Sequence, residues 1–272
     1  MTEFLSFSFV RMGLMAAVII GATCSLIGVF VVLRGMSYVG AGISHGCLAG
    51  VALALLLGWH PMLLSVIATL IMVFFIEILG RKASLKMDAS IGVIFSLAMA
   101  FAVLFIGMMR RYTQDIMSYL FGNLLQVTPA DLWAGLAVGL LVSLVIALFY
   151  KEIQFSTFDP EMAEVSGIPA AVISLLLTLL MGLTIVISLK AVGELMVLAL
   201  IVLPASTAYQ LTRTLRKMII ISVALGVFAS VTGLVASFYL NAPSGPTIVI
   251  ILGFMFFLSL LLRGVGFKRQ PG

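Results

Sequence analysis

The chain has 272 residues, of which 63% are hydrophobic and 9% are charged, and its mean hydropathy is +1.29. Soluble domains carry roughly one-quarter charged residues, so this composition excludes a soluble globular protein and indicates an integral membrane protein. The formal net charge of +5 does not indicate a nucleic-acid partner, because the basic residues stand at the ends of apolar segments. No polar stretch is long enough for a second domain, so residues 1–272 are expected to form one transmembrane domain.

Apolar segments of about 20 residues, the length needed to cross a bilayer, recur along the chain between turn-forming and charged residues. They predict nine spans, at Val10–Leu33, Val39–Leu57, Met62–Leu79, Ala89–Met108, Ala130–Tyr150, Ala170–Leu189, Val192–Gln210, Met218–Leu240 and Thr247–Leu262. A count of eight would follow if the short segment that holds His45 is broken or re-entrant. The mixed stretch Arg110–Pro129 predicts a short interfacial or re-entrant helix. The expected fold is an all-α polytopic bundle of eight or nine transmembrane helices.

The basic residues predict the orientation of the chain in the membrane. With nine spans, four basic residues fall on one side of the membrane, namely Arg11, Arg110, Arg111 and Lys190. The other side holds the remainder, which are Arg34, Arg81, Lys82, Lys86, Lys151, Arg213, Arg216, Lys217, Arg263, Lys268 and Arg269. Cytoplasmic loops carry an excess of Lys and Arg, so we expect the N-terminus outside the cell and the C-terminus in the cytoplasm.

One cytoplasmic loop, "KEIQFSTFDPEMAEVSGIP" at Lys151–Pro169, is longer than a simple connection requires. Proline suits the first turn of a helix and acidic residues favour its positive end, so Asp159, Pro160 and Glu161 predict a helix start. Gly167 can end that helix. The pattern predicts a short amphipathic helix on the cytoplasmic face. Two interpretations stay open, a docking element for a soluble partner and a solvated loop.

Six blocks occur in the order "VVLRGMSYVGAGISHGCLAGVALALLLGW", "MDASIGVIFSLAMAFAVLF", "YLFGNLLQVTPAD", "FDPEMAEVSGIP", "VISLKAVGELMVLALIVLPASTA" and "NAPSGPTIVI". Together they resemble the permease subunits of ATP-binding cassette importers for zinc, manganese or iron(II). The resemblance implies a homodimer in the inner (plasma) membrane of a prokaryote, docked to cytoplasmic ATPase subunits and supplied by an extracytoplasmic metal-binding protein. It implies that the loop at Phe158–Gly167 is the coupling helix, with Phe158, Asp159, Pro160 and Glu161 in or next to the ATPase contact.

Energy for transport is expected to come from that partner. The chain contains no G-x-x-x-x-G-K-[ST] motif for ATP, so hydrolysis belongs to a separate subunit and the chain itself is expected not to be an enzyme. The resemblance implies alternating access, in which hydrolysis reorients the bundle between outward-open and inward-open states. No covalently bound cofactor is expected, and the transported ion is the small-molecule ligand.

The stretch "GAGISHGCLAG", Gly40–Gly50, places one of the two histidines among small residues inside the second span. Neutral imidazole is a good ligand for borderline transition metals, and ionisable groups inside membrane segments are commonly functional. A packing histidine bonded to a backbone carbonyl is the alternative interpretation. The glycines indicate close helix packing and a narrow polar path. In the resembling family His45 matches a metal-path ligand.

Two acidic positions of the family pattern are changed in this chain. The family commonly has an aspartate one helical turn before the histidine, where this chain has Ala41, and an acid before the P-x-G-P turn, where it has Asn241. The amide oxygen of Asn241 could still bind a metal ion. Glu194 could replace the missing carboxylate if its span neighbours that of His45, and it could equally pair with Lys190 four residues earlier.

His45, Glu194 and Asn241 are therefore the candidate metal ligands. The sequence favours zinc over manganese or iron, because an imidazole without an established carboxylate is a poorer manganese site. A permease for a metal chelate, siderophore or vitamin is one alternative, and it would need a wide apolar cavity. A self-contained channel or secondary transporter is the other, and it would need central acidic residues, which are scarce here.

Overall fold

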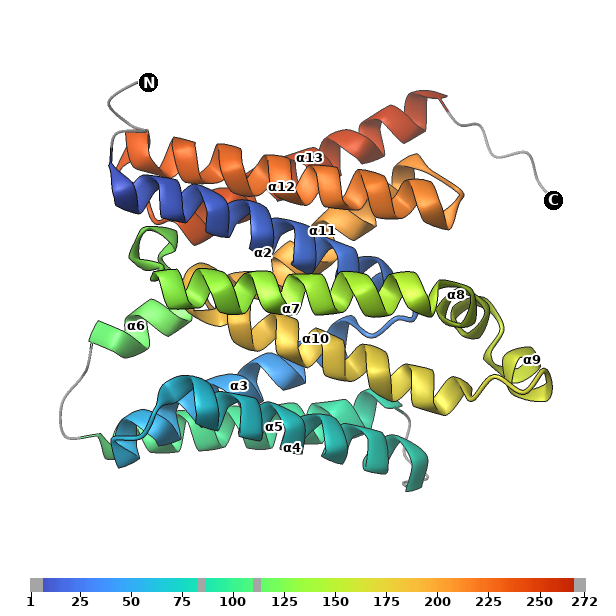
Figure 1. The fold of residues 1–272 in the computed structure, drawn as a ribbon, viewed down its shortest axis with the longest axis horizontal. Coiled ribbons are helices and arrows are strands. Elements are labelled where there is room, and N and C mark those ends of the chain that lie inside the picture. The colour runs from blue at the N-terminus through green and yellow to red at the C-terminus, as the bar shows by residue number, and fades with distance from the viewer. Residues whose placement is uncertain (1–6, 83–86, 110–113, 267–272) are drawn as a thin grey trace.

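The structure, a computed structural model, describes residues 7–82, 87–109 and 114–266. The described residues form helices and no strand, and the long helices run side by side along one axis (Figure 1). The long helices are α2 (Ser8–Leu33), α3 (Ser37–Leu57), α4 (Pro61–Lys82), α5 (Met87–Met108), α7 (Pro129–Leu148), α10 (Ala170–Val192), α11 (Glu194–Leu211), α12 (Leu215–Leu240) and α13 (Ser244–Gly266). The short ones are α6 (Gln114–Phe121), the 3₁₀ turn η1 (Leu124–Gln126), α8 (Tyr150–Phe158) and α9 (Pro160–Val165).

Each predicted span coincides with one long helix, which confirms the all-α membrane bundle. Within the described residues, 8 helices are long and apolar enough to cross a membrane. The remaining long helix, α11, has 18 residues and contains the apolar stretch Met196–Leu211. The segment that holds His45 is not broken, because α3 is continuous from Ser37 to Leu57. Helix α11 is the shortest of these long helices.

Local sequence signals set several of the helix ends. At the start of α7, Thr128 Oγ1 accepts a hydrogen bond from the Asp131 amide at 3.3 Å, and Asp131 Oδ2 accepts one from the Thr128 amide at 2.9 Å. This reciprocal pattern is a capping box, and Pro129 occupies the first helical position, where its missing N–H costs nothing. The predicted helix in Arg110–Pro129 is present as α6, over the described residues of that stretch.

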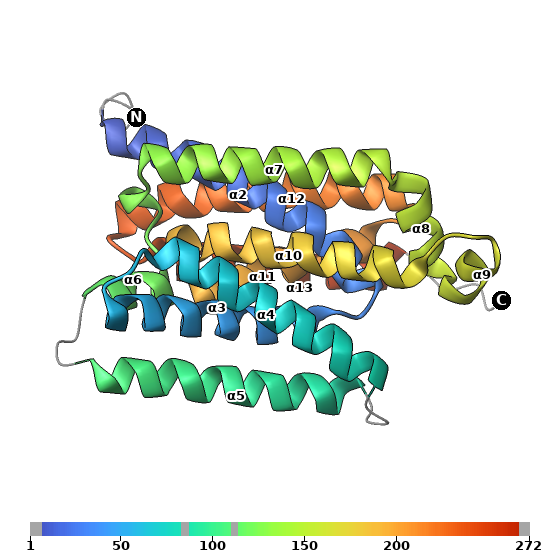
Figure 2. The ribbon, with the colours of Figure 1, turned by 60° about the horizontal axis from the view of Figure 1, so that its bottom comes forward.

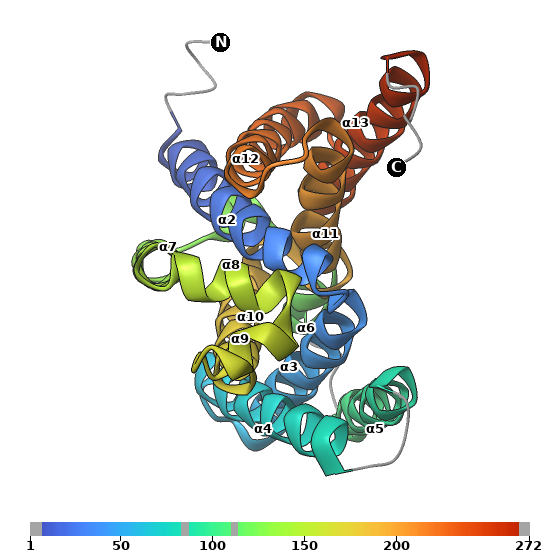
Figure 3. The same ribbon diagram turned by 90° about the vertical axis from the view of Figure 1, so that its right-hand side faces the viewer.

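Helix α2 lies at the centre of the bundle, in contact with α7, α10, α11 and α12 (Figure 3). Where it crosses α12, Ser222 Oγ donates a hydrogen bond to the Ser25 carbonyl at 2.9 Å in a buried position. Such interhelical bonds contribute about 0.6 kcal/mol each in membrane bundles, so close packing supplies most of the association energy. The helices α3, α4 and α5 form a second group beside α10 (Figure 2).

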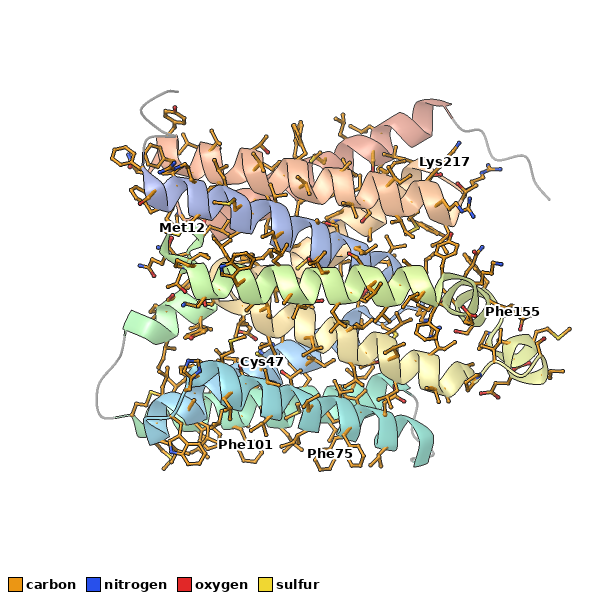
Figure 4. All side chains as sticks on the ribbon, in the orientation of Figure 1. Met12, Cys47, Phe75, Phe101, Phe155 and Lys217 are labelled. Atoms are coloured by element: carbon orange, nitrogen blue, oxygen red, sulfur yellow. The ribbon has the colours of Figure 1, made fainter. Side chains whose placement is uncertain are left out.

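Apolar side chains cover the outside of the bundle as well as its interior. Phe75 on α4 and Phe101 on α5 point away from the other helices (Figure 4) and are 49% and 47% exposed. Exposed apolar side chains along a helix of membrane-crossing length match the hydrocarbon of a bilayer. The core is therefore defined by helix contacts, and the outward residues face lipid.

The two ends of the bundle differ. The α6 end holds the start of α2, α6 and the connection between α12 and α13, whereas the α9 end holds α8, α9 and the end of α13 (Figure 1). Helix α8 follows α7 almost without a break, whereas the sequence predicts Tyr150 as the end of the fifth span and the residues after it as part of the loop. The α9 end therefore carries more ordered structure than the sequence indicated.

Candidate metal site

A partly buried histidine and a buried glutamate meet between α3 and α11. Nδ1 of His45 contacts Oε1 of Glu194, and the side chains are 15% and 3% exposed. A carboxylate removed from water is costly unless a partner compensates it, and the imidazole is that partner here. The sequence allows this contact only if the span of Glu194 neighbours the span of His45. Helices α3 and α11 do pack against each other. The structure thus brings together two of the three candidate ligands.

Gly193 directs Glu194 toward α3. It separates α10 from α11 with φ of 90° and ψ of 154°, a backbone conformation that is essentially restricted to glycine. A Cβ at this position would lie 2.4 Å from the carbonyl carbon of Phe121 at the end of α6, so the two backbones leave no room for a side chain. The break allows Glu194 to start a new helix, where the positive end of the helix dipole favours a carboxylate.

The surroundings of His45 are mostly apolar. Its ring packs edge-on against Phe95 of α5, with ring centroids 4.5 Å apart and an interplanar angle of 83°. Ala41, one helical turn before His45, lines a pocket of about 460 Å³ together with Tyr38, Ile91, Gly92 and Phe95. The position at which the resembling family carries an aspartate thus faces open space, and the described residues that line it include no carboxylate.

Within the described residues, two side chains of the usual metal-ligating types meet at this site. No group of three or more His, Cys, Asp and Glu side chains that could hold a metal ion is found in the part of the chain that the structure describes. Cys47 is a free, buried thiol two residues after His45, so it lies on a different face of α3. A site with two protein ligands leaves coordination positions open for water or other donors.

Gly50 of α3 serves helix packing. A Cβ on Gly50 would lie 2.7 Å from the Leu64 carbonyl oxygen and 2.7 Å from the Ala68 Cβ of α4. This close approach of α3 and α4 requires a residue without a side chain. The close packing predicted from the sequence is therefore present, and the narrow polar path stays a prediction.

Asn241 has a different position from the other two candidate ligands. It is the exposed C-cap of α12, with φ of 51°, and its backbone N–H donates to the Ser237 carbonyl. Asparagine is one of the few residues other than glycine that enter this left-handed region. Among the hydrogen bonds and ion pairs of the described residues, none joins Asn241 to His45 or Glu194. Its metal role stays a prediction, and its visible role is helix termination.

Lys190 pairs with Asp131 rather than with Glu194. Lys190 Nζ lies 2.7 Å from Asp131 Oδ2, which joins α10 to the capping box of α7. The alternative in which Lys190 neutralises Glu194 through their spacing is therefore not realised. The sequence could not reveal this pairing, because Asp131 lies far away along the chain and becomes a neighbour only through packing of α7 on α10.

Substituting Lys190 by glutamine is expected to leave metal uptake unchanged and to lower the free energy of unfolding by about 1 kcal/mol or less, because both partners are partly exposed. Chemical unfolding in detergent and vesicle uptake measure the two quantities. A strong loss of uptake would instead show that Lys190 acts on the His45–Glu194 pair.

The predicted coupling residues lie together at the α9 end. Asp159 caps α9, and its Oδ1 accepts a hydrogen bond from the Met162 amide at 2.9 Å, while Pro160 occupies the first turn and Glu161 is exposed beside it. This confirms the predicted short helix. Phe158 is 61% exposed and Val165 is 83% exposed, on a segment that projects beyond α8 and α10 (Figure 2). Exposed apolar side chains on such a projection are typical of a surface that binds a partner.

Comparison with known proteins identifies the family. Residues 6–263 match the model of the ABC 3 transport family. The chain is 38% identical over 257 residues to the manganese transport system membrane protein MntC of Halalkalibacterium halodurans, over 94% of this chain and 88% of that protein. It is 33% identical over 251 residues to the high-affinity zinc uptake system membrane protein ZnuB of Haemophilus influenzae, over 92% and 96% of the two chains.

A solved structure agrees with these relatives. The chain matches PsaBC from Streptococcus pneumoniae in complex with Fab with a TM-score of 0.86 and 32% identity, and the match covers 95% of both chains. The helical bundle, the nearly full-length family match and the relatives above 30% identity all agree. The chain therefore belongs to the ABC 3 transport family.

Proposed function

We propose that this chain is the membrane permease subunit of an ATP-binding cassette importer for a divalent transition-metal ion, with manganese(II) first and zinc(II) second. The observation that carries the proposal is the contact between the His45 imidazole and the buried Glu194 carboxylate inside a membrane bundle. Ionisable side chains in such a position are costly and are usually functional. Imidazole and carboxylate together bind manganese, iron and zinc.

The choice of metal rests on Glu194. The sequence favours zinc on the assumption that no carboxylate lies beside His45. In the structure Glu194 contacts His45 and supplies an anionic oxygen there, so that assumption does not hold. Carboxylate ligands suit manganese(II). Two relatives support the same order, since MntC of Halalkalibacterium halodurans and ScaB of Streptococcus gordonii are both named as manganese permeases, and ZnuB keeps zinc as the second candidate.

The His45–Glu194 pair would bind the metal ion transiently during transport. The negative charge of Glu194 lowers the electrostatic cost of a cation in the bundle, and the neutral His45 nitrogen supplies a second ligand. A transporter must bind its ion well enough to admit it and weakly enough to release it. Two ligands from different helices suit that requirement, because a relative movement of α3 and α11 would separate them and release the ion.

The partners follow from the same proposal. A cytoplasmic ATPase would bind the projecting α9 segment, and an extracytoplasmic metal-binding protein would deliver the ion at the α6 end. The N-terminus would lie outside, the C-terminus in the cytoplasm, and two copies of the chain would form the permease in a prokaryotic plasma membrane. ATP hydrolysis in the partner would then drive alternating access.

Uptake by reconstituted vesicles tests this function. Vesicles that contain the chain, its ATPase and its binding protein should import manganese(II) in an ATP-dependent manner, with zinc(II) and iron(II) measured in parallel. His45→Ala removes a proposed ligand and should lower the rate by at least about 10-fold to 100-fold, the loss found when a group that only supports a metal ligand is removed. His60→Ala, which removes the other histidine of the chain from an exposed turn, is the matched control and should keep wild-type uptake.

The outcomes separate the alternatives. Import of a metal chelate, siderophore or vitamin without import of any free ion would overturn the proposal and favour that alternative. Metal flux without the ATPase would favour a self-contained channel or secondary transporter. Unchanged uptake in His45→Ala would remove His45 from the path and leave a packing role.

A further inference from the structure

The connection between α2 and α3 holds a half-buried arginine in a defined backbone position. Arg34 is the C-cap of α2, and Gly35 follows it with φ of 67°. The Met36 amide donates to the Val31 carbonyl at 2.8 Å, and the Gly35 amide donates to the Val32 carbonyl at 3.2 Å. These two bonds form a Schellman motif, which satisfies the last carbonyls of the helix. The motif sets where Arg34 stands and how α3 begins.

The guanidinium of Arg34 reaches the last turn of α8. Its Nε donates to Thr157 Oγ1 at 3.0 Å, and its Nη2 donates to Ser156 Oγ. The Thr157 hydroxyl itself donates to the Ile153 carbonyl at 2.6 Å, so its free lone pair faces the arginine. The planar guanidinium presents two parallel donors, which fit two adjacent acceptors better than a lysine could.

The charge of Glu77 on α4 also acts on Arg34. Burial lowers the pKa of Arg34, and the Glu77 carboxylate opposes that shift through its charge. Helix α4 packs along α3, which carries His45. The hydrogen bonds of Arg34 therefore join α8 to the α2–α3 connection, which leads into α3 and, through its packing, to α4.

Helix α8 leads directly into α9, which carries the predicted coupling residues Pro160 and Glu161. Phe158 is its last residue and Asp159 caps α9, immediately after the two hydroxyl groups that bind Arg34. Helices α8 and α9 pack against each other, and both contact α10. Energetic coupling travels through packed helices and hydrogen-bonded side chains that move together. A displacement of α9 would thus reach Arg34 within one helical turn.

We propose that Arg34 is a positioning residue that transmits movement of α8 and α9 to α3 and α4, and through them to the His45–Glu194 pair. This inference rests on the proposed function, because it assumes that a partner ATPase moves α9. Hydrogen bonds from a charged donor are stronger than neutral ones, so the arginine keeps the end of α8 attached to the α2–α3 connection when α9 moves. Without Arg34, α8 would move relative to α2 when α9 moves, and the movement would not reach α3.

The test uses the full transporter in vesicles and measures manganese(II) uptake and ATP hydrolysis in the same preparation. Arg34→Gln should lower the number of ions imported per ATP by about tenfold, while ATP hydrolysis stays within about twofold of the wild type. Arg34→Lys should restore part of the ratio, because an ammonium group can still donate to one of the two hydroxyls. A merely structural arginine would change uptake and hydrolysis together and leave their ratio unchanged.

Two further variants keep the test informative if Arg34→Gln fails to fold. Thr157→Val combined with Ser156→Ala removes both acceptors and leaves Arg34 in place, and it should lower the same ratio. Arg216→Gln is the matched control, since Arg216 is an exposed arginine whose Cζ lies 5.9 Å from the centroid of the Tyr150 ring at the other end of α8. It loses the same charge and should keep the wild-type ratio.

An unchanged ratio in the arginine and hydroxyl variants would overturn the role of Arg34 and leave the metal permease in place. A fall in the ratio for Arg216→Gln as large as for Arg34→Gln would also overturn it, because the effect would then come from charge alone. Failure of the wild-type transporter to import manganese(II) or zinc(II) would overturn the proposed function, and this inference with it.

Discussion

A transporter that carries Glu194→Gln is expected to import metal ions about 100-fold more slowly than the wild type while the chain stays folded. This is the upper end of the loss found when a group that only supports a metal ligand is removed, and Glu194 is proposed as a ligand itself. The substitution keeps the shape of the side chain and removes its charge. Because Glu194 is 3% exposed, the glutamine is also less costly to bury than the carboxylate. Thermal stability in detergent should therefore not fall, although uptake does.

Because uptake and thermal stability are measured separately, a loss of metal binding can be distinguished from a loss of folding. Vesicle uptake and direct titration of the purified protein with manganese(II) measure the site, and thermal unfolding measures the fold. Glu194→Asp keeps the charge on a shorter side chain and should retain part of the uptake. A stable Glu194→Gln protein with wild-type uptake would contradict the metal role and leave the His45–Glu194 contact as a packing feature.

Gly193→Ala is expected to lower the free energy of unfolding by about 3 kcal/mol and to abolish metal uptake, because it combines backbone strain with overpacking. The backbone at Gly193 has φ of 90°, and a Cβ there would lie 2.4 Å from the Phe121 carbonyl carbon and 2.5 Å from the Gly122 nitrogen. Both neighbours are backbone atoms, so they cannot move aside as the end of a flexible side chain could. The collision could be relieved only if the end of α6 moved away from Gly193, which lies between α10 and α11. That movement would displace Glu194.

Gly58→Ala is the control for the strain alone. Gly58 has φ of 69°, and no atom of the described residues lies within 4 Å of the place that a Cβ would take, so its substitution carries the conformational cost without the collision. That cost is about 1–2 kcal/mol, and uptake should be unaffected. Equal effects of the two substitutions on stability and uptake would contradict the inference that the close approach of α6 positions Glu194.

The local elements were predictable because their causes are local. In lipid every backbone N–H and C=O must find a partner within the protein, so an apolar segment of sufficient length forms a helix whatever surrounds it. The same holds for α9, whose start depends on Asp159 and Pro160 themselves. Helix α8 was missed because its mixed sequence carries no lipid-facing pattern, and its residues are held by contacts with α7, α9 and α10 and by Arg34.

The candidate site was predictable only in part. His45 stands out by residue type, since an imidazole inside an apolar span is unusual. The choice between Lys190 and His45 as the partner of Glu194 could not be made from spacing, because the i, i+4 relation assumes one continuous helix. Gly193 interrupts that helix between the two residues, so Lys190 turns to Asp131 and Glu194 turns to His45.

The amino-acid sequence by itself determined that this chain is a membrane bundle, where its spans lie, and that a short capped helix follows the fifth span. Each of these depends on hydrogen bonds and side chains within one segment. The tertiary structure alone decided which charged groups meet, namely His45 with Glu194, Lys190 with Asp131, and Arg34 with the hydroxyls of α8. These pairs join residues far apart in the chain, and they form only where helix packing brings two segments within contact distance.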